Sequence, residues 1–285
     1  MEVVAILFQL TIGIAVGMLY WIVSAGLTFT FGVTRVLNFA HGAFYMLGAY
    51  FTLTFFELSN NYIFALLFGA FLAGLVGAGC ERAFISRIYR LPIPFQLILT
   101  FGLVLLFDDM VKMIWGLTPK MTSALFLGAI NFFGRAIPMF SVYMIIAGIL
   151  IGLLLYVVLF KTYWGVQIRA ITVDVETATC YGLNPSFLYP TAFMFGSFLA
   201  GLGGGLTLPI SSAAPGMGEH ILVYAFIVTV IGGLGNIKGA LVSAILIGVI
   251  ESLGTLFVPW LTIALPYIAM SAVLLVRPEG LFGEV

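Results

Sequence analysis

The chain has 285 residues, of which 62% are hydrophobic and only 8% are charged. Its mean hydropathy of +1.21 is far above that of a water-soluble domain, so the composition excludes a soluble globular fold and predicts an integral membrane protein. The 11 basic and 11 acidic residues balance, which gives no electrostatic reason to expect nucleic acid as a partner. Cys80 and Cys180 lie far apart and in no ligand spacing, so neither a disulfide framework nor a metal site is predicted.

Polar interruptions divide the chain into eight or nine predicted transmembrane helices. A bilayer core about 30 Å thick requires roughly 20 apolar residues in each helix. The first segment follows Glu2 directly, without a charged leader or a clear cleavage site, so we expect it to be retained as a helix. The predicted crossings are 4–31, 39–56, 62–80, 95–115, 140–160, 188–209, 221–234, 240–257 and 261–276.

The segment 221–234 is short for a crossing, and the glycine-rich stretch GGLGNIKGA begins within it. We therefore expect a half-helix, a tight hairpin or a re-entrant piece there, which is why the helix count is given as eight or nine. No proline- or serine-rich linker divides the chain, so residues 1–285 are predicted to form a single membrane domain. The expected fold class is an all-α integral membrane protein.

Lysine and arginine concentrate on one predicted side of the membrane. The loop ERAFISRIYR and the loop after Phe160 are separated by two crossings, so they share a side. The positive-inside rule makes this side cytoplasmic, which places the N-terminus outside and the C-terminus inside. Eight of the 11 basic residues fall on it: Arg35, Arg82, Arg87, Arg90, Lys161, Arg169, Lys238 and Arg277.

The stretch RVLNFAHGAFYMLGAY, residues 35–50, places several polar groups between two apolar segments. One interpretation is a cytoplasmic turn, in which Asn38 and Gly42 shape the chain and His41 caps a helix end. The alternative is an unwound section at membrane depth, where Asn38 and His41 provide hydrogen bonds inside a cavity. Local chemistry leaves both interpretations open.

Three blocks of sequence carry a resemblance to a known family. They are GLTFTFGVTRVLNFAHGAFYMLGAY, KTYWGVQIRAITVDVETATCYGLNPSFLYPTAFMFGSFLAGLGGGL and GGLGNIKGALVSAILIGVIESLG. In this order, and across most of the chain, they resemble the LivH-type permeases, the membrane subunits of ABC importers for branched-chain amino acids. The resemblance implies an ABC importer transmembrane permease domain over 1–285.

Residues 166–180 form a predicted short amphipathic helix between two spans, and Gly182 is expected to end it. Its charge is nearly balanced, with Arg169 against Asp174 and Glu176, which suits an anionic lipid surface poorly. We therefore favour docking into another protein over lying on the membrane.

The resemblance implies the same role for a slightly longer segment, residues 163–185. In the family this segment couples the permease to its ATPase subunit by sitting in a groove of that subunit. Four residues match the family motif there: Arg169, Ala170, Asp174 and Gly182.

ATP has to be bound by other chains, because no G-x-x-x-x-G-K-[ST] phosphate loop is present. We expect no cofactor in this chain, with ATP and magnesium held by the partner ATPase subunits. The resemblance implies two cytoplasmic ATPase subunits, a second permease of the LivM type and a periplasmic or extracellular substrate-binding protein. It also implies the bacterial plasma (inner) membrane as the location.

An intramembrane enzyme and a passive channel are the alternatives to a permease. The adjacent carboxylates Asp108 and Asp109 could indicate an intramembrane enzyme, but consecutive residues on a helix point about 100° apart, so the two cannot share a proton. The favourable pair is Asp108 with Lys112, which lies four residues later on the same helix face. No sequence motif of a protease or hydrolase is present, so no enzyme and no catalytic residue is expected. A passive channel is disfavoured because it needs no coupling segment.

The predicted substrate path contains Asn38, His41, Gly42, Gly203 and Gly204. The two later glycines are candidates for an unwound helix whose backbone faces a solute, although close helix packing is the alternative. A path with few fixed charges suits a small solute without strong net charge. Branched-chain or other hydrophobic amino acids are the leading substrates, and urea or short amides, which related permeases carry, are the second choice.

Overall fold

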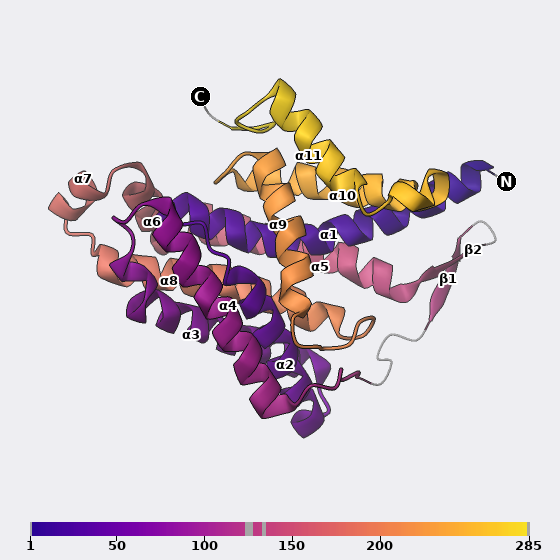
Figure 1. The fold of residues 1–285 in the computed structure, drawn as a ribbon, viewed down its shortest axis with the longest axis horizontal. Coiled ribbons are helices and arrows are strands. Elements are labelled where there is room, and N and C mark those ends of the chain that lie inside the picture. The colour runs from indigo at the N-terminus through magenta and orange to yellow at the C-terminus, as the bar shows by residue number, and fades with distance from the viewer. Residues whose placement is uncertain (1, 123–127, 133–134, 284–285) are drawn as a thin grey trace.

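The computed structural model describes residues 2–122, 128–132 and 135–283, and helices dominate it (Figure 1). The long elements are α1 (Glu2–Thr34), α2 (His41–Ser59), α3 (Tyr62–Ala83), α4 (Ile93–Trp115), α5 (Met139–Lys161), α8 (Pro185–Thr207), α9 (Met217–Gly232), α10 (Ile237–Phe257) and α11 (Leu265–Val276). The short elements are η1 (Ile85–Arg87), β1 (Ala129–Phe132), β2 (Arg135–Pro138), α6 (Tyr163–Val173), α7 (Val175–Cys180) and η2 (Pro259–Leu261).

Five of the described helices are long and apolar enough to cross a membrane by length and composition: α1, α3, α5, α8 and α10. The apolar helices α9 and α11 are shorter. Helices α2 and α4 have 19 and 23 residues and lie in the same bundle. This agrees with the prediction of a helical membrane protein, while the number of crossings and the orientation of the termini stay predictions.

A two-stranded hairpin between α4 and α5 was not expected from the sequence. Strands β1 and β2 pair antiparallel, with Ala129 opposite Pro138 and Ile130 opposite Ile137. The region between the two helices is long and rich in glycine, proline and polar residues, so it does not continue either helix. Antiparallel pairing satisfies backbone groups that a helix would otherwise satisfy.

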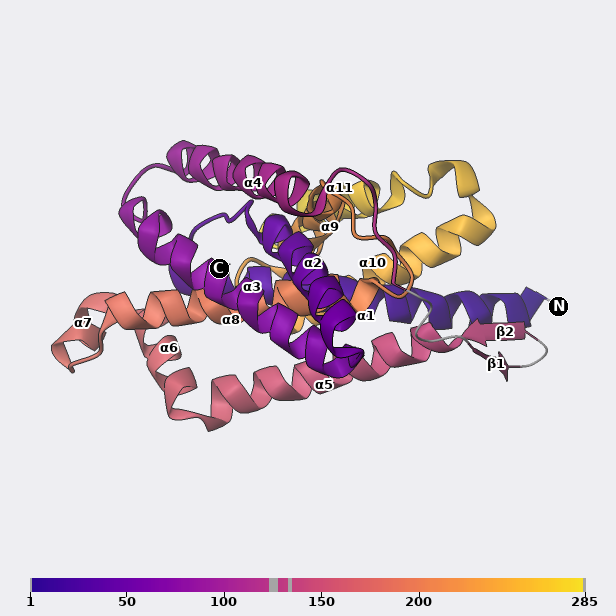
Figure 2. The same ribbon diagram turned by 90° about the horizontal axis from the view of Figure 1, so that it is seen from below.

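Helix α2 packs against α3, α4, α8 and α9 and lies in the middle of the bundle in Figure 2. Most of its first 13 residues are fully buried. Gly48 allows the close approach to α8, because a Cβ there would overlap the backbone of Gly201. Helices α4 and α5 lie on opposite sides of this core (Figure 2).

The two ends of the bundle carry different loops. Thr34 at the end of α1, the η1 region and the start of α8 line one hollow, so the basic loops that were predicted to share a side do lie together. The C-terminal segment is at the same end, since the Asn236 side chain donates to the carbonyl oxygen of Phe282 and Gly235 lies against Gly32. The start of α1 and the β1–β2 hairpin lie at the opposite end (Figure 1).

Helix α9 is shorter than the candidate spans, as the short segment 221–234 predicted, but it begins four residues earlier, at Met217. Gly216 precedes it with φ of 79°, a left-handed conformation that glycine adopts without strain. Gly233, with φ of 95°, ends it, and α10 follows after a short turn.

Candidate functional site

The chain folds back on itself after α1. Residues 35–40 contain no helix or strand, and Arg35 at their start has φ of 57°. Helix α2 then begins with His41, whose Nε2–H donates a hydrogen bond of 2.9 Å to the carbonyl oxygen of Val23. Val23 lies about three helical turns before Thr34, so α2 begins well inside the bundle and not at its rim. This geometry agrees with the unwound section and not with a turn at the rim.

The first turns of α2 and α9 meet backbone to backbone. A Cβ at Gly42 would overlap the carbonyl oxygen of Gly218, and a Cβ at Gly218 would overlap that of Gly42. Neither helix has a side chain capping its N-terminus: Ala40 and Gly216 occupy the cap positions without such a bond. Two helix N-termini without a capping side chain, each with the positive end of a helix dipole, therefore lie side by side. The N–H groups of His41, Met217 and Glu219 already donate to backbone carbonyl oxygens.

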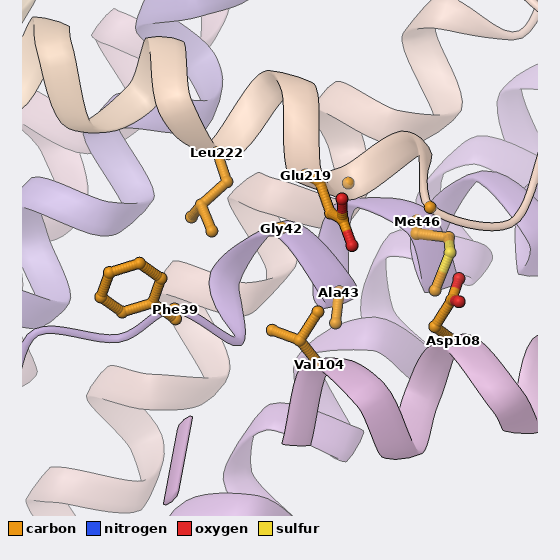
Figure 3. A pocket seen from close by; sticks show the side chains of 10 residues that line it. Phe39, Gly42, Ala43, Met46, Val104, Asp108, Glu219 and Leu222 are labelled. Carbon is orange, nitrogen blue, oxygen red and sulfur yellow. The ribbon is translucent and has the colours of Figure 1, made fainter. Parts of the chain in front are cut away.

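A small cavity lies between α2, α4 and α9 at this meeting point (Figure 3). Most of its wall is apolar, but one carboxylate comes from α4 and another from α9. Figure 3 shows Asp108 and Glu219 extending from their helices toward the space beside α2. The lining residues are Phe39, Gly42, Ala43, Met46, Val104, Asp108, Gly216, Gly218, Glu219 and Leu222.

Only one of the two carboxylate oxygens of Asp108 has a partner among the described residues. Its Oδ2 lies 2.6 Å from the Nζ of Lys112, the pairing that the sequence predicted, and Lys112 also reaches Asp109 at 3.0 Å. The other oxygen, Oδ1, is buried and has no hydrogen-bond partner among the described residues. A buried acceptor without a hydrogen-bond partner destabilises the fold, so a hydrogen bond from a solute or a water to Oδ1 would be favourable.

Asn38 and His41 are fully buried beside the cavity but do not line it. Neither the amide nitrogen nor the amide oxygen of Asn38 has a partner in the described structure, and Nδ1 of His41 also has none. The sequence placed both residues in the substrate path. The structure brings them next to Gly42, which does line the cavity, and their direct contact with a solute stays a prediction.

Gly203 and Gly204 lie apart from the cavity, in the regular part of α8. A Cβ at Gly204 would overlap the carbonyl oxygen of Tyr45 on α2, and one at Gly203 would come within 2.6 Å of the Val23 side chain. The unwinding proposed for these glycines is therefore absent, because helical geometry continues through them to Thr207. Their observed role is close packing of α8 against α1 and α2.

The predicted coupling segment projects from the end of the bundle opposite the hairpin (Figures 1 and 2). It contains two helices and not one, because Asp174 ends α6 and caps α7. The Asp174 carboxylate accepts hydrogen bonds from the backbone N–H of Glu176 and of Thr177 at 3.0 and 3.1 Å. A hydrogen bond from the Thr177 hydroxyl, together with these two backbone bonds, holds the pKa of Asp174 below its ordinary value. A capping aspartate thus interrupts the apolar periodicity that predicted one helix.

The base of this segment is anchored and its tip is exposed. Trp164 donates a hydrogen bond from Nε1 to the Thr191 hydroxyl on α8, and Ile168 and Ile171 are buried. At the tip, Val173 and Tyr181 are 88% and 86% exposed. An anchored base with an apolar, exposed tip suits transmission of force from a docked protein.

The four residues that match the family motif lie along this segment. Arg169 donates to the Leu159 carbonyl oxygen and stacks 5.0 Å from the centre of the Phe160 ring, so it fixes the α5–α6 corner. Ala170 accepts from the N–H of Asp174 at the end of α6. Gly182, with φ of 84°, follows α7 in the left-handed conformation expected of a helix stop.

Two carboxylates have surroundings that the sequence did not indicate. Glu219 was not singled out, because it lies just before the predicted segment 221–234, yet it lines the cavity. Glu251 on α10 is the second: the hydroxyls of Tyr20 and Tyr224 donate hydrogen bonds to its carboxylate at 2.6 and 3.2 Å. Acidic residues within apolar segments were the signal available for both.

Comparisons with known proteins agree with the predicted resemblance. Residues 9–276 match the family described as branched-chain amino acid transport system / permease component. The chain is 26% identical to the high-affinity branched-chain amino acid transport system permease protein BraD of Pseudomonas aeruginosa, over 99% of this chain and 97% of that protein. It is 29% identical to the probable branched-chain amino acid transport permease protein LivH of Methanocaldococcus jannaschii, over 92% and 88%.

A third relative is the high-affinity branched-chain amino acid transport system permease protein LivH of Salmonella typhimurium, with 24% identity over 97% of this chain and 95% of that protein. No solved structure matches the chain significantly. The family match extends over nearly the whole chain, and the described structure supplies several apolar helices of spanning length. The protein therefore belongs to the branched-chain amino acid transport permease family and is a multi-pass membrane protein.

Proposed function

We propose that this chain is a membrane-spanning permease subunit of an ATP-driven importer of branched-chain or other hydrophobic amino acids. The observation that carries the proposal is the cavity between α2, α4 and α9, where two uncapped helix N-termini and two carboxylates face one largely apolar space. The N-terminus lies outside and the C-terminus in the cytoplasm, in the bacterial inner membrane.

The cavity chemistry suits a small zwitterion. The ammonium group of an amino acid is a donor for the free Oδ1 of Asp108 and for Glu219. Its carboxylate is favoured near the starts of α2 and α9, where the positive ends of the helix dipoles favour negative charge. The cavity has a volume of about 10 Å³, which is room for about one water, so α2, α4 and α9 have to separate before Met46 and Leu222 can contact an aliphatic side chain. Urea, the alternative substrate, has neither charged group and would use the carboxylates less well.

Alternating access depends on the segment 163–185. When two ATPase subunits close on ATP, they move the exposed tip around α7, and the anchored base passes that movement to α8 through Trp164. Helix α8 packs directly against α1 and α2, so the displacement reaches the start of α2 and the cavity.

The complete transporter contains further chains. A second permease of the LivM type packs against the face formed by α4 and α9, because the exposed Asp109 and His220 on that face would be costly in contact with lipid. A periplasmic or extracellular binding protein delivers the substrate. ATP and magnesium belong to the ATPase subunits.

The test is uptake by the complex reconstituted in vesicles with its cognate binding protein, using leucine, isoleucine, valine and urea, each with and without ATP. ATP-dependent uptake of a branched-chain amino acid supports the proposal. Uptake of urea alone would move the permease to the alternative substrate class. Uptake that ignores ATP would mean a channel and would refute the coupling role of residues 163–185.

A further inference from the structure

A second and much larger hollow lies at the end of the bundle that carries the basic loops. It has a volume of about 1160 Å³ and is separate from the cavity at α2. The end of α3, the η1 region, α7 and the start of α8 form its walls. The lining residues are Thr34, Glu81, Arg82, Ser86, Arg87, Tyr89, Arg90, Val175, Glu176, Thr179, Cys180, Pro185, Ser186, Tyr189 and Pro190.

Three arginines line this hollow and make it positively charged. Arg82, Arg87 and Arg90 are exposed, and none forms an ion pair within residues 2–122, 128–132 and 135–283. A guanidinium group has a planar set of donors that matches the oxygens of a phosphate. Three such groups within one nine-residue loop are an arrangement suited to a phosphate anion.

The two carboxylates in the hollow compensate the arginines only in part. Glu81 is buried, and its Oε1 accepts a hydrogen bond of 2.5 Å from the Tyr89 hydroxyl. Glu176 lies in the first turn of α7 and is exposed. Three positive groups against two negative ones leave a net positive hollow. The N-terminus of the long helix α8, at Pro185 and Ser186, adds the positive end of its dipole.

Two exposed apolar residues that follow lining residues in the sequence indicate what kind of anion fits. Leu91, next to Arg90, is 43% exposed, and Phe187, next to Ser186, is 61% exposed. A soluble anion gains nothing from such a margin, whereas a phospholipid needs apolar contacts for its acyl chains next to polar contacts for its headgroup.

We propose that this hollow binds the phosphate headgroup of an anionic phospholipid from the cytoplasmic leaflet. The headgroup lies against the arginines of the loop between α3 and α4, and its acyl chains lie along Leu91 and Phe187. Because α7 and the start of α8 form the opposite wall, the bound lipid braces the base of the segment 163–185 against α3. Neither this binding nor its test depends on the transported substrate.

Native mass spectrometry of the purified chain tests the site, with phosphatidylglycerol and phosphatidylcholine offered at equal concentration. We expect the wild-type chain to retain phosphatidylglycerol preferentially. The variant Arg87→Gln/Arg90→Gln should lose roughly 30-fold of that preference, because each arginine near a membrane surface contributes about five- to sixfold. The control is Arg277→Gln, an exposed arginine outside the hollow, which should keep the wild-type preference.

Three results would overturn the proposal. The first is equal retention of the two lipids by the wild type, or an equal loss of preference in Arg277→Gln. The second is displacement of phosphatidylglycerol by millimolar inorganic phosphate, which would make the site one for a soluble anion. The third is unchanged lipid preference in the double variant together with lost binding of the ATPase subunit, which would assign the hollow to that protein. If the double variant misfolds, Arg87→Gln alone should lose about fivefold.

Discussion

Helices α2 and α7 begin in opposite ways. Helix α7 begins on the surface, and the Asp174 side chain accepts hydrogen bonds from the backbone N–H groups of Glu176 and Thr177. Helix α2 begins in the interior with Ala40 at its cap, and the amide of Asn38 beside it has no partner among the described residues. A helix end that its own side chains satisfy has a structural role, whereas an unsatisfied end inside a membrane protein is available to a solute.

The largest effect is expected where the start of α2 is packed. Gly42→Ala places a Cβ on the carbonyl oxygen of Gly218, and neither backbone can move without separating α2 from α9. We expect a destabilisation of about 3 kcal/mol or more and loss of folded protein, measured by thermal unfolding after purification. Gly79→Ala is the matched control, because nothing lies within 4 Å of a Cβ there. Equal yield of the two variants would contradict the close contact.

The next effect concerns the carboxylate in the cavity. Asp108→Asn keeps the shape of the side chain but removes the charge that would bind a substrate ammonium group. We expect uptake of a branched-chain amino acid to fall at least about tenfold, mainly through a higher KM, with the complex still assembled. Asp109→Asn is the control, because Asp109 also pairs with Lys112 but does not line the cavity. If both variants lose the same activity, only the ion pair matters.

A smaller effect is expected at the start of α7. Asp174→Lys removes the cap and reverses the charge at the exposed tip, so the chain should insert normally while ATPase subunits co-purify several-fold less. Asp174→Asn keeps the cap and should bind nearly as the wild type. Unchanged co-purification of Asp174→Lys would contradict the docking assignment.

The same cap predicts how association depends on pH. Since hydrogen bonds lower the pKa of Asp174, its contribution is present above the ordinary carboxyl pKa and is lost only as the pH falls through the lowered value. ATPase co-purification should therefore show no Asp174-dependent change between pH 8 and about pH 5. A titration in that range that Asp174→Asn abolishes would contradict this.

The sequence predicted those features of the fold that depend on residues close together in the chain. The apolar runs predicted the long helices, and the basic loops predicted which loops lie together at one end of the bundle. Gly182 predicted where the helix before it ends. The break at Asp174 was missed, because apolar spacing continues through Val173 and Val175 while a capping bond depends on backbone geometry. The hairpin of β1 and β2 was missed because an isolated hairpin has a weak pattern.

The candidate site could be predicted only in part. RVLNFAHG marked the place, but the depth at which α2 begins depends on contact with Val23, 18 residues away. The cavity also needs Asp108 and Glu219, which are distant in sequence from each other and from Gly42. The sequence around Gly203 and Gly204 is the same whether α8 unwinds there or packs closely. The neighbouring Val23 and Tyr45 show that it packs closely.

The smallest effect on stability, and the sharpest test of the unsatisfied end, is expected from Asn38→Leu. Leucine has a similar size and removes two buried polar atoms that have no partner in the described structure, so thermal stability should stay the same or rise slightly. If a passing solute uses the amide, uptake should fall several-fold at the same time. A variant that is as stable and as active as the wild type would show that Asn38 only shapes the chain before α2.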